Sequence, residues 1–416
     1  MAKTNLGISK KGRGRMGINI TYMGTKRWVA SAVSEVINTT QNGILLDAFS
    51  GMCAVGEAVG PVRQIWNNDI QIFASNVARA LFVSTDSPLS ALSCGDIHFE
   101  QYKIQRDRLV RVFRASLDAE DDLLRSQNYS DFESRRRRVA ELLGRDIEGC
   151  RTLSPHLFAT TYSGTFFGIR QAVDADAIVT SIQAARRERK ISRDEALWGV
   201  VGLGRALLKV ANSTGHFAQY LKPKQASYRR YLALRRRSLW AEWISSLVDM
   251  SPIGDPFWRR GNKAFQSDAL NLIPRLARKK ADVAVIYADP PYTDDQYSRF
   301  YHVLETLCLY DYPKVSGAGL YRPARFTAPF SLKAQAPKAL GKLIHASSRT
   351  GADLVLSYPT NGLVNKKHVD IEAELKKHFK HVEIARSVPH KHSTFGASKG
   401  AAKSHAMELI YLARSA

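Results

Sequence analysis

An acid, two prolines and a tyrosine directly follow a continuous apolar run. The run is Val283 to Ala288, and the next four residues are Asp289, Pro290, Pro291 and Tyr292. A carboxylate and the carbonyl of the first proline can both accept hydrogen bonds from one aromatic amino group, which localises the nitrogen lone pair for attack. The tyrosine ring offers a flat face for a nucleobase. The pattern favours alkyl transfer to such a nitrogen, and an ordinary strand-ending turn is the alternative.

Several apolar runs predict the strands that must position these residues. They begin at Gly43 and cover Val62 to Trp66, Val283 to Ala288, Leu354 to Leu356 and Met407 to Leu412. Strands that alternate with helical patterns are typical of a doubly wound α/β sheet. Such sheets bind ligands at the carboxyl ends of their strands, so the acid after the third run is expected at the mouth of a crevice.

Residues 97–263 differ in character and predict a mainly helical insertion. They contain arginine-rich runs such as "SRRRRVAELLGR" and "YRRYLALRRRSLW". Residues 1–96 would then form an N-terminal arm and the first part of a sheet domain, and 264–416 its second part. Two stretches of the insertion, 161–171 and 212–224, combine glycine, aromatic and basic or amide residues, which suits contacts with phosphates and base edges.

The charge balance favours a polyanionic partner. The 416 residues include 61 Lys and Arg against 38 Asp and Glu, a formal net charge of +23. Nucleic acid is the simplest partner for such a protein. Four widely spaced cysteines suggest neither a zinc site nor a disulfide framework, which fits a reducing cytoplasm. No apolar stretch approaches the length of a membrane span, so no membrane association is expected.

The motifs, taken in order, resemble the alpha group of amino-methyltransferases, which includes the Dam-type DNA adenine methylases. The chain carries "TYMGTKR", "LLDAFSGMCAVG" and "NND" before the insertion, and "AFQSDALNLI" and "DPPY" after it. The resemblance implies a Rossmann-like class I methyltransferase sheet with a helical DNA-recognition domain inserted in it. It also implies S-adenosylmethionine as the cofactor and double-stranded DNA as the substrate.

The same resemblance assigns the site residues. The cofactor contacts would be Tyr22, Gly24, Lys26, Asp47, Phe49, Gly51, Asp69, Asp268 and Asp289. The target amino group would be held by Asp289, Pro290, Pro291 and Tyr292, and DNA by Tyr162, Arg170, His216, Gln219, Lys222 and Lys224. No metal ligand is assigned. Cys53 stands where the family has a second glycine, so either the turn is shifted or the thiol is accommodated.

A few further residues have positions that follow from their local sequence. His390 and His392 are expected on a surface loop, and Asp294 and Asp295 are expected to face solvent or to cap the next helix. Glu408 is either a buried strand residue or a functional acid facing the end of the sheet. Phe300 is expected to pack in the core.

The family resemblance implies methyl transfer to the N6 amino group of a flipped adenine within a specific DNA sequence. We expect a cytoplasmic bacterial or phage-encoded enzyme, with a cognate restriction endonuclease as a candidate partner. Two alternatives remain open at this stage. One is the same reaction at N4 of cytosine, whose amino group is electronically alike. The other is a basic nucleic-acid-binding protein with a vestigial cofactor fold. Neither the recognition sequence nor the oligomeric state follows from the sequence.

Overall fold

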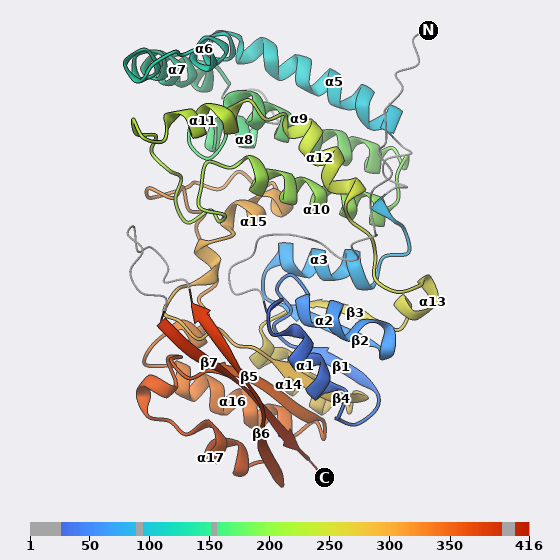
Figure 1. Ribbon diagram of the computed structural model, residues 1–416. Helices are drawn as coiled ribbons and strands as arrows, with labels where there is room; N and C mark the ends of the chain where they lie inside the picture. Colours follow the sequence, from blue (N-terminus) through green and yellow to red (C-terminus); the bar gives the residue numbers. More distant parts are fainter. Residues whose placement is uncertain (1–25, 89–94, 151–155, 393–403, 416) are drawn as a thin grey trace.

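The computed structural model describes residues 26–88, 95–150, 156–392 and 404–415. They form a sheet lobe and a helical lobe, which lie one above the other in Figure 1. The sheet has seven strands in the order β3-β2-β1-β4-β5-β7-β6. Their bounds are β1 Ile44–Asp47, β2 Ile65–Asp69, β3 Lys263–Gln266, β4 Val283–Ala288, β5 Asp353–Pro359, β6 His381–His392 and β7 Ser404–Arg414. The neighbouring strands among β1 to β5 pair in parallel, whereas β7 is antiparallel to both β5 and β6.

Helices cover both faces of the sheet. Leu45 of β1 packs in a core with α1 (Ala30–Ile37), α2 (Ala54–Val59) and α3 (Ile72–Phe82). The next residue, Leu46, points to the opposite face and packs with α14 (Ala269–Arg278), α16 (Ala336–Ser348) and α17 (Ile371–Lys376). Because both faces are covered, all six residues of β4 are buried, which explains the continuous apolar run in the sequence.

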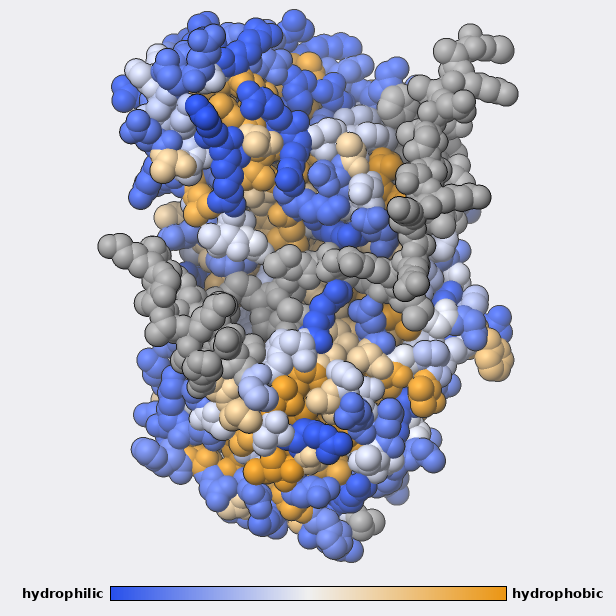
Figure 2. All heavy atoms as spheres, viewed as in Figure 1, coloured by the Kyte–Doolittle hydropathy of each residue, from blue (hydrophilic) through white to orange (hydrophobic). Residues whose placement is uncertain are grey.

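The helical lobe follows α3 in the chain. It contains α5 (Gly95–Val112), α6 (Arg114–Leu124), α7 (Tyr129–Gly149), α8 (Leu157–Thr161), α9 (Ile169–Arg187), α10 (Arg193–Val210), α11 (Tyr228–Arg235) and α12 (Leu239–Val248). The short α13 (Pro256–Arg259) lies beside the sheet lobe in Figure 1. Hydrophilic side chains dominate the visible face of the helical lobe in Figure 2. Two arginines of the run in α7 pair with acids on their own helix, Arg135 with Asp131 and Arg136 with Glu133, as on a solvated surface.

One core joins the two lobes. α9, α10 and α12 pack in the same apolar cluster as α1 to α3. Gly204 on α10 makes the contact close, because a Cβ there would lie 2.3 Å from the ring of Phe73 on α3. α15 (His302–Leu309) also packs against α3 and α10. The helical lobe is therefore fixed relative to the carboxyl edge of the sheet.

The structure confirms the predicted α/β fold and corrects several strands. β4 coincides with its predicted run, but the strand expected at Val62 to Trp66 is β2, which begins three residues later and includes two polar asparagines. β3 and β6 were not predicted, because both are edge strands without a continuous apolar run. His390 and His392 lie in β6, so their assignment to a loop was wrong.

Candidate active site

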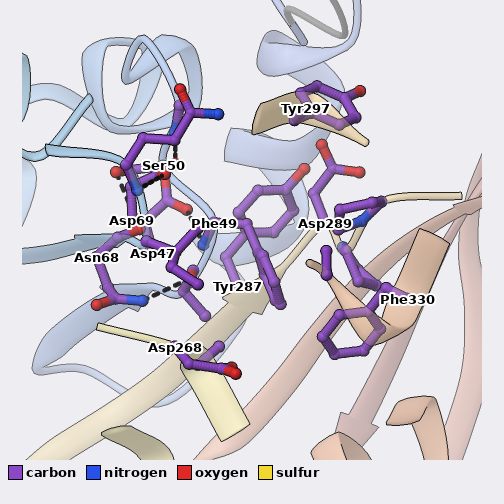
Figure 3. A pocket seen from close by; sticks show the side chains of 18 of the residues that line it. Asp47, Phe49, Ser50, Asn68, Asp69, Asp268, Tyr287, Asp289, Tyr297 and Phe330 are labelled. Atoms are coloured by element: carbon purple, nitrogen blue, oxygen red, sulfur yellow. Dashed lines mark hydrogen bonds between the residues drawn. The ribbon is translucent and has the colours of Figure 1, made fainter. Parts of the chain in front are cut away.

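A cleft lies where β1, β2 and β4 end. It encloses about 1000 Å³, part of it open to solvent. Figure 3 shows the turn after β1, the acid that ends β2 and the segment after β4 converging on this space. The carboxyl edge of a parallel sheet is where an α/β fold binds ligands.

The described members of the predicted cofactor and catalytic sets come together here. The cleft is lined by Lys26, Asp47, Phe49, Gly51, Asp69, Asp268, Asp289, Pro290, Pro291 and Tyr292. Tyr22 and Gly24 lie outside the described residues. The ten described residues come from five separate sequence segments, and the fold brings these segments together at one cleft.

The turn after β1 is tied to the end of β2 by a carboxylate. Gly51 has a φ of +47°, the left-handed region that glycine tolerates best, and its N–H donates to Asp69 Oδ2 at 2.9 Å. Asp69 Oδ1 accepts from the N–H of Gln71 at 2.8 Å. Burial raises the pKa of Asp69 to about 6, although these N–H donors oppose the rise. The acid is thus oriented at the floor of the cleft.

Cys53 is accommodated in this turn without filling the cleft. Its φ of +63° is left-handed, which costs a non-glycine residue some strain. Its side chain is fully buried in the core beneath the turn and is absent from the cleft lining. Burial raises the pKa of the thiol, which keeps it protonated.

Two further polar side chains, those of Asn68 and Asp268, hold the turns at the base of the cleft in place. Asn68 donates through Nδ2 to the carbonyls of Ala48 and Ser267, both at 3.0 Å, so it links the turns after β1 and β3. Asp268 caps α14 by accepting from the N–H of Leu270 at 2.9 Å.

A buried ion cluster stands at the end of β4. The Lys26 ammonium lies 3.1 Å from Asp289 Oδ1 and 2.6 Å from Glu408 Oε1. The exposed fractions of the three side chains are 6%, 13% and 0%. The ammonium also lies 5.0 Å from the centre of the Tyr292 ring. The two carboxylates outweigh the effect of burial and raise the pKa of Lys26.

The protonation of Asp289 is balanced near neutrality. Burial raises its pKa to about 7; Lys26 acts in the opposite direction, and Glu408 adds to the rise. Asp47 behaves similarly, because burial and the nearby Asp289 and Asp69 raise its pKa to about 8 against a hydrogen bond from the N–H of Phe49. These acids would ionise more readily beside a cationic ligand.

Aromatic side chains complete the walls. Phe49 meets Phe330 edge to face with ring centres 5.5 Å apart, and Tyr292 meets Tyr358 in the same way at 6.5 Å. Tyr297 lies on the far side of Asp289 from Phe330 in Figure 3. The sequence analysis missed Tyr287, Tyr297, Phe326 and Phe330 as lining residues. Phe326 and Phe330 belong to the segment "FTAPF". Only the proximity of this segment to the cleft indicates their role, and the sequence does not reveal that proximity.

The residues predicted to contact DNA fall into different environments. Tyr162 is fully buried and its hydroxyl lies 3.3 Å from Thr306 Oγ1, so its assignment as a DNA contact is corrected to a packing role. Arg170 pairs with Asp121 at 2.7 Å, with 40% of its side chain exposed. His216 is half-buried and accepts from the N–H of Ala218. Of the residues predicted to contact DNA, Gln219, Lys222 and Lys224 are exposed.

The loop that carries these exposed residues is attached to the segment after Tyr292. The N–H of Phe217 donates to the carbonyl of Phe300 at 2.7 Å, and His302 Nε2 lies 2.9 Å from the carbonyl of Phe217. Phe300 is buried, as predicted. Asp294 is largely exposed and pairs with Lys333, so it faces solvent as expected, whereas Asp295 is partly buried.

Membrane and metal sites find no support in the part of the chain that the structure describes. No helix there is both long and apolar enough to cross a bilayer. Nor do three or more His, Cys, Asp and Glu side chains gather there in a way that could hold a metal ion.

Known proteins resemble both the cleft region and most of the chain. Residues 269–360, from the start of α14 to just past β5, match the family model for D12 class N6 adenine-specific DNA methyltransferases. The chain is 24% identical to the type II methyltransferase M.FokI of Planomicrobium okeanokoites, over 86% of this chain and 47% of that protein. It is 20% identical to the modification methylase StsI of Streptococcus sanguinis, over 83% and 45%. The chain therefore spans about half the length of these relatives. No solved structure gives a significant match.

Proposed function

We propose that this chain, a member of the D12 class N6 adenine-specific DNA methyltransferase family, transfers a methyl group from S-adenosylmethionine to N6 of adenine in double-stranded DNA. One observation carries the proposal. A carboxylate and a tyrosine that suit an exocyclic amino group, Asp289 and Tyr292, share one cleft with Gly51 and Asp69, which suit a nucleoside cofactor.

The charge of the lining suits S-adenosylmethionine. Four acids, Asp47, Asp69, Asp268 and Asp289, face the cleft together with the single described lysine of its lining, Lys26. When bound, S-adenosylmethionine supplies an electrophilic methyl group on a positively charged sulfur. Asp69 would accept hydrogen bonds from its ribose hydroxyls, as acids at this position do in dinucleotide folds. Asp268 would contact its adenine.

The catalytic work of the chain is positioning and hydrogen bonding. The target base must leave the helix to reach the cleft, and the ring of Tyr292 would then stack on it. The Asp289 carboxylate and the carbonyl of Pro290 would accept the two N–H hydrogens and direct the nitrogen lone pair at the methyl group. No strong base is required, because the nitrogen becomes cationic on transfer and then loses its proton readily.

Incubation of the protein with unmethylated DNA and methyl-labelled cofactor tests this function. Nucleoside analysis of the product should give N6-methyladenine. Recovery of N4-methylcytosine would assign the reaction to the cytosine alternative, which the matched family does not favour. Salt-dependent DNA binding without saturable cofactor binding would instead indicate a non-catalytic nucleic-acid-binding protein.

Asp69→Asn is expected to weaken cofactor binding by about 10- to 100-fold, because a hydrogen bond to a charged group contributes about 1.5–3 kcal/mol. Asn keeps the size of the side chain but loses one of the two acceptor oxygens that orient the turn. Calorimetric titration with the cofactor measures the effect. Asp282→Asn, at the exposed opposite end of β4, is the matched control. Equal affinities in the two variants would contradict the role of Asp69.

Lys222→Ala and Lys224→Ala should each weaken binding to all DNA sequences by about the same factor, because a phosphate contact does not depend on the base sequence. Both lysines are exposed on the loop anchored at Phe217. A lost phosphate contact lowers the slope of log K against log salt by about 0.9. Fluorescence anisotropy at several salt concentrations measures the slope. Lys342→Ala, exposed on α16 of the sheet lobe, should leave it unchanged. Unaltered slopes in both loop variants would exclude phosphate contacts there.

The cellular setting is also a proposal. Relatives described as modification methylases support a cognate restriction endonuclease as partner and a cytoplasmic location. Mapping methylated bases in the genome of cells that express this chain would give its recognition sequence. That sequence should be protected from a cognate nuclease in the same cells.

A further inference from the structure

The fold brings a residue from the last strand to the catalytic acid. β7 runs antiparallel to β5, and Glu408 pairs with Pro359, the final residue of β5. Because β5 lies next to β4, this register puts Glu408 at the same edge of the sheet as Asp289. The two carboxylates meet at one ammonium group, that of Lys26.

Glu408 has unusually few partners for a buried acid. Its side chain is completely buried, Oε1 bonds to Lys26 at 2.6 Å, and Oε2 has no hydrogen-bond partner within the described residues. A buried carboxylate satisfied on one oxygen only is a poor stabilising device, and apolar residues often serve a core better. The contact with Lys26 is therefore the feature of Glu408 that calls for a role.

Two distances show how the Lys26 ammonium is shared between the two carboxylates. The ammonium is closer to Glu408 than to Asp289, and its nearest Asp289 atom is the buried oxygen Oδ1. Asp289 nevertheless keeps 13% of its side chain exposed and lines the cleft. Because Lys26 is shared with Glu408, its ammonium does not fully neutralise the Asp289 carboxylate.

We propose that Glu408 is a positioning residue for methyl transfer: it holds Lys26 against Oδ1 of Asp289, so that Oδ2 remains a strong hydrogen-bond acceptor for the target amino group. The inference rests on the proposed function and extends it to a residue on β7. Glu408 does not touch the substrate. It acts through Lys26 alone.

Among the described residues, the other groups that face Glu408 do not compete for this role. They are Tyr287 on β4, Tyr292 after β4 and Tyr358 on β5. Burial raises the pKa of each of these tyrosines, so all three stay neutral over the range in which the enzyme can be assayed. Lys26 and Asp289 are thus the charged neighbours that respond when Glu408 is changed.

Glu408→Gln tests the proposal. With a neutral side chain at 408, Lys26 is expected to close on Asp289, which lowers the affinity of Asp289 for protons and weakens it as an acceptor. We expect kcat to fall about tenfold, with KM for cofactor and DNA changed by less than about threefold. The acid limb of the kcat–pH profile should move to lower pH. Asp289 loses the negative charge of Glu408 nearby, and Lys26 then pairs with Asp289 alone, so the pKa of Asp289 falls.

A structural acid provides the control. Asp176 is fully buried in α9 and accepts from the N–H groups of Phe158 and Ala159 and from the hydroxyl of Tyr310, away from the cleft. Asp176→Asn should lower the melting temperature without moving the acid limb. An acid limb in Glu408→Gln that coincides with the wild type would overturn the positioning role.

A second variant covers the case in which Glu408→Gln does not fold. Glu408→Asp keeps the charge but shortens the reach to Lys26, so kcat should fall while the acid limb stays near its wild-type position. Wild-type kcat in this variant would equally overturn the role. An inactive wild-type protein on every DNA tested would refute the proposed function itself, which separates the two failures.

Discussion

Asp289→Asn is expected to reduce kcat about 1000-fold, the upper range for removing one preorganised electrostatic contact from an active site. The amide has the same size, but its NH2 group would face the NH2 group of the target base, and its oxygen accepts less strongly than a carboxylate. Lys26 would keep Glu408 as a partner, so the fold should survive. Single-turnover methylation at saturating cofactor and DNA measures the chemical step.

The control for this variant lies a few residues along the same segment. Asp294 is 59% exposed and pairs with Lys333 outside the cleft. Asp294→Asn should retain wild-type turnover. If Asp289→Asn turned over as fast as Asp294→Asn while binding cofactor normally, the amino group would have to be held elsewhere.

The sequence predicted the sheet best where burial is strongest. β4 was placed correctly because its six residues are buried on both faces and must all be apolar. β2 was misplaced because Asn67 and Asn68 interrupt the apolar pattern, although both are buried in the strand. The amide of Asn68 is needed to link two turns, a demand that no local pattern expresses.

The positions of candidate site residues could be predicted where a motif lies at the end of a strand. The acids that end β1 and β2 and those that follow β3 and β4 all line the cleft, because the carboxyl ends of parallel strands share one edge of the sheet. Glu408 could not be linked to Lys26 in this way, because the link depends on the antiparallel register of β7. Tyr162 was misread because an aromatic residue beside glycine has the same pattern whether it packs or contacts a base.

The charge of the cleft is opposite to that of the chain. A protein with a net charge of +23 presents several carboxylates and one described lysine at its proposed reaction centre. DNA phosphates would be attracted to the molecule but repelled from this cleft. A flipped base is neutral and can enter. The charge distribution therefore favours the arrangement that the chemistry requires, with the backbone outside and the base inside.

Lys26→Met is expected to have the second-largest effect and the opposite pH response to Glu408→Gln. Removal of the ammonium leaves two buried carboxylates without a cation, which should cost about 3–5 kcal/mol of stability. The pKa of Asp289, already raised to about 7, should rise further, because Lys26 is the group that lowers it. An acceptor that must be ionised is then largely protonated at pH 7, so the acid limb should move upward by at least about one unit, where one unit corresponds to about 1.4 kcal/mol.

Activity of Lys26→Met at pH 7 should fall about 50-fold if the pKa of Asp289 rises by about two units from about 7, and it should recover in part at pH 9. Lys333→Met removes an exposed lysine that pairs with Asp294 and should leave the profile unchanged. Thermal unfolding of both variants separates the loss of stability from the shift in pH response. A Lys26→Met profile parallel to that of the wild type, merely lower at every pH, would mean that the lysine supports the fold without setting the charge of Asp289. An upward shift here together with a downward shift in Glu408→Gln is hard to produce by general destabilisation, because that would move both profiles in the same direction.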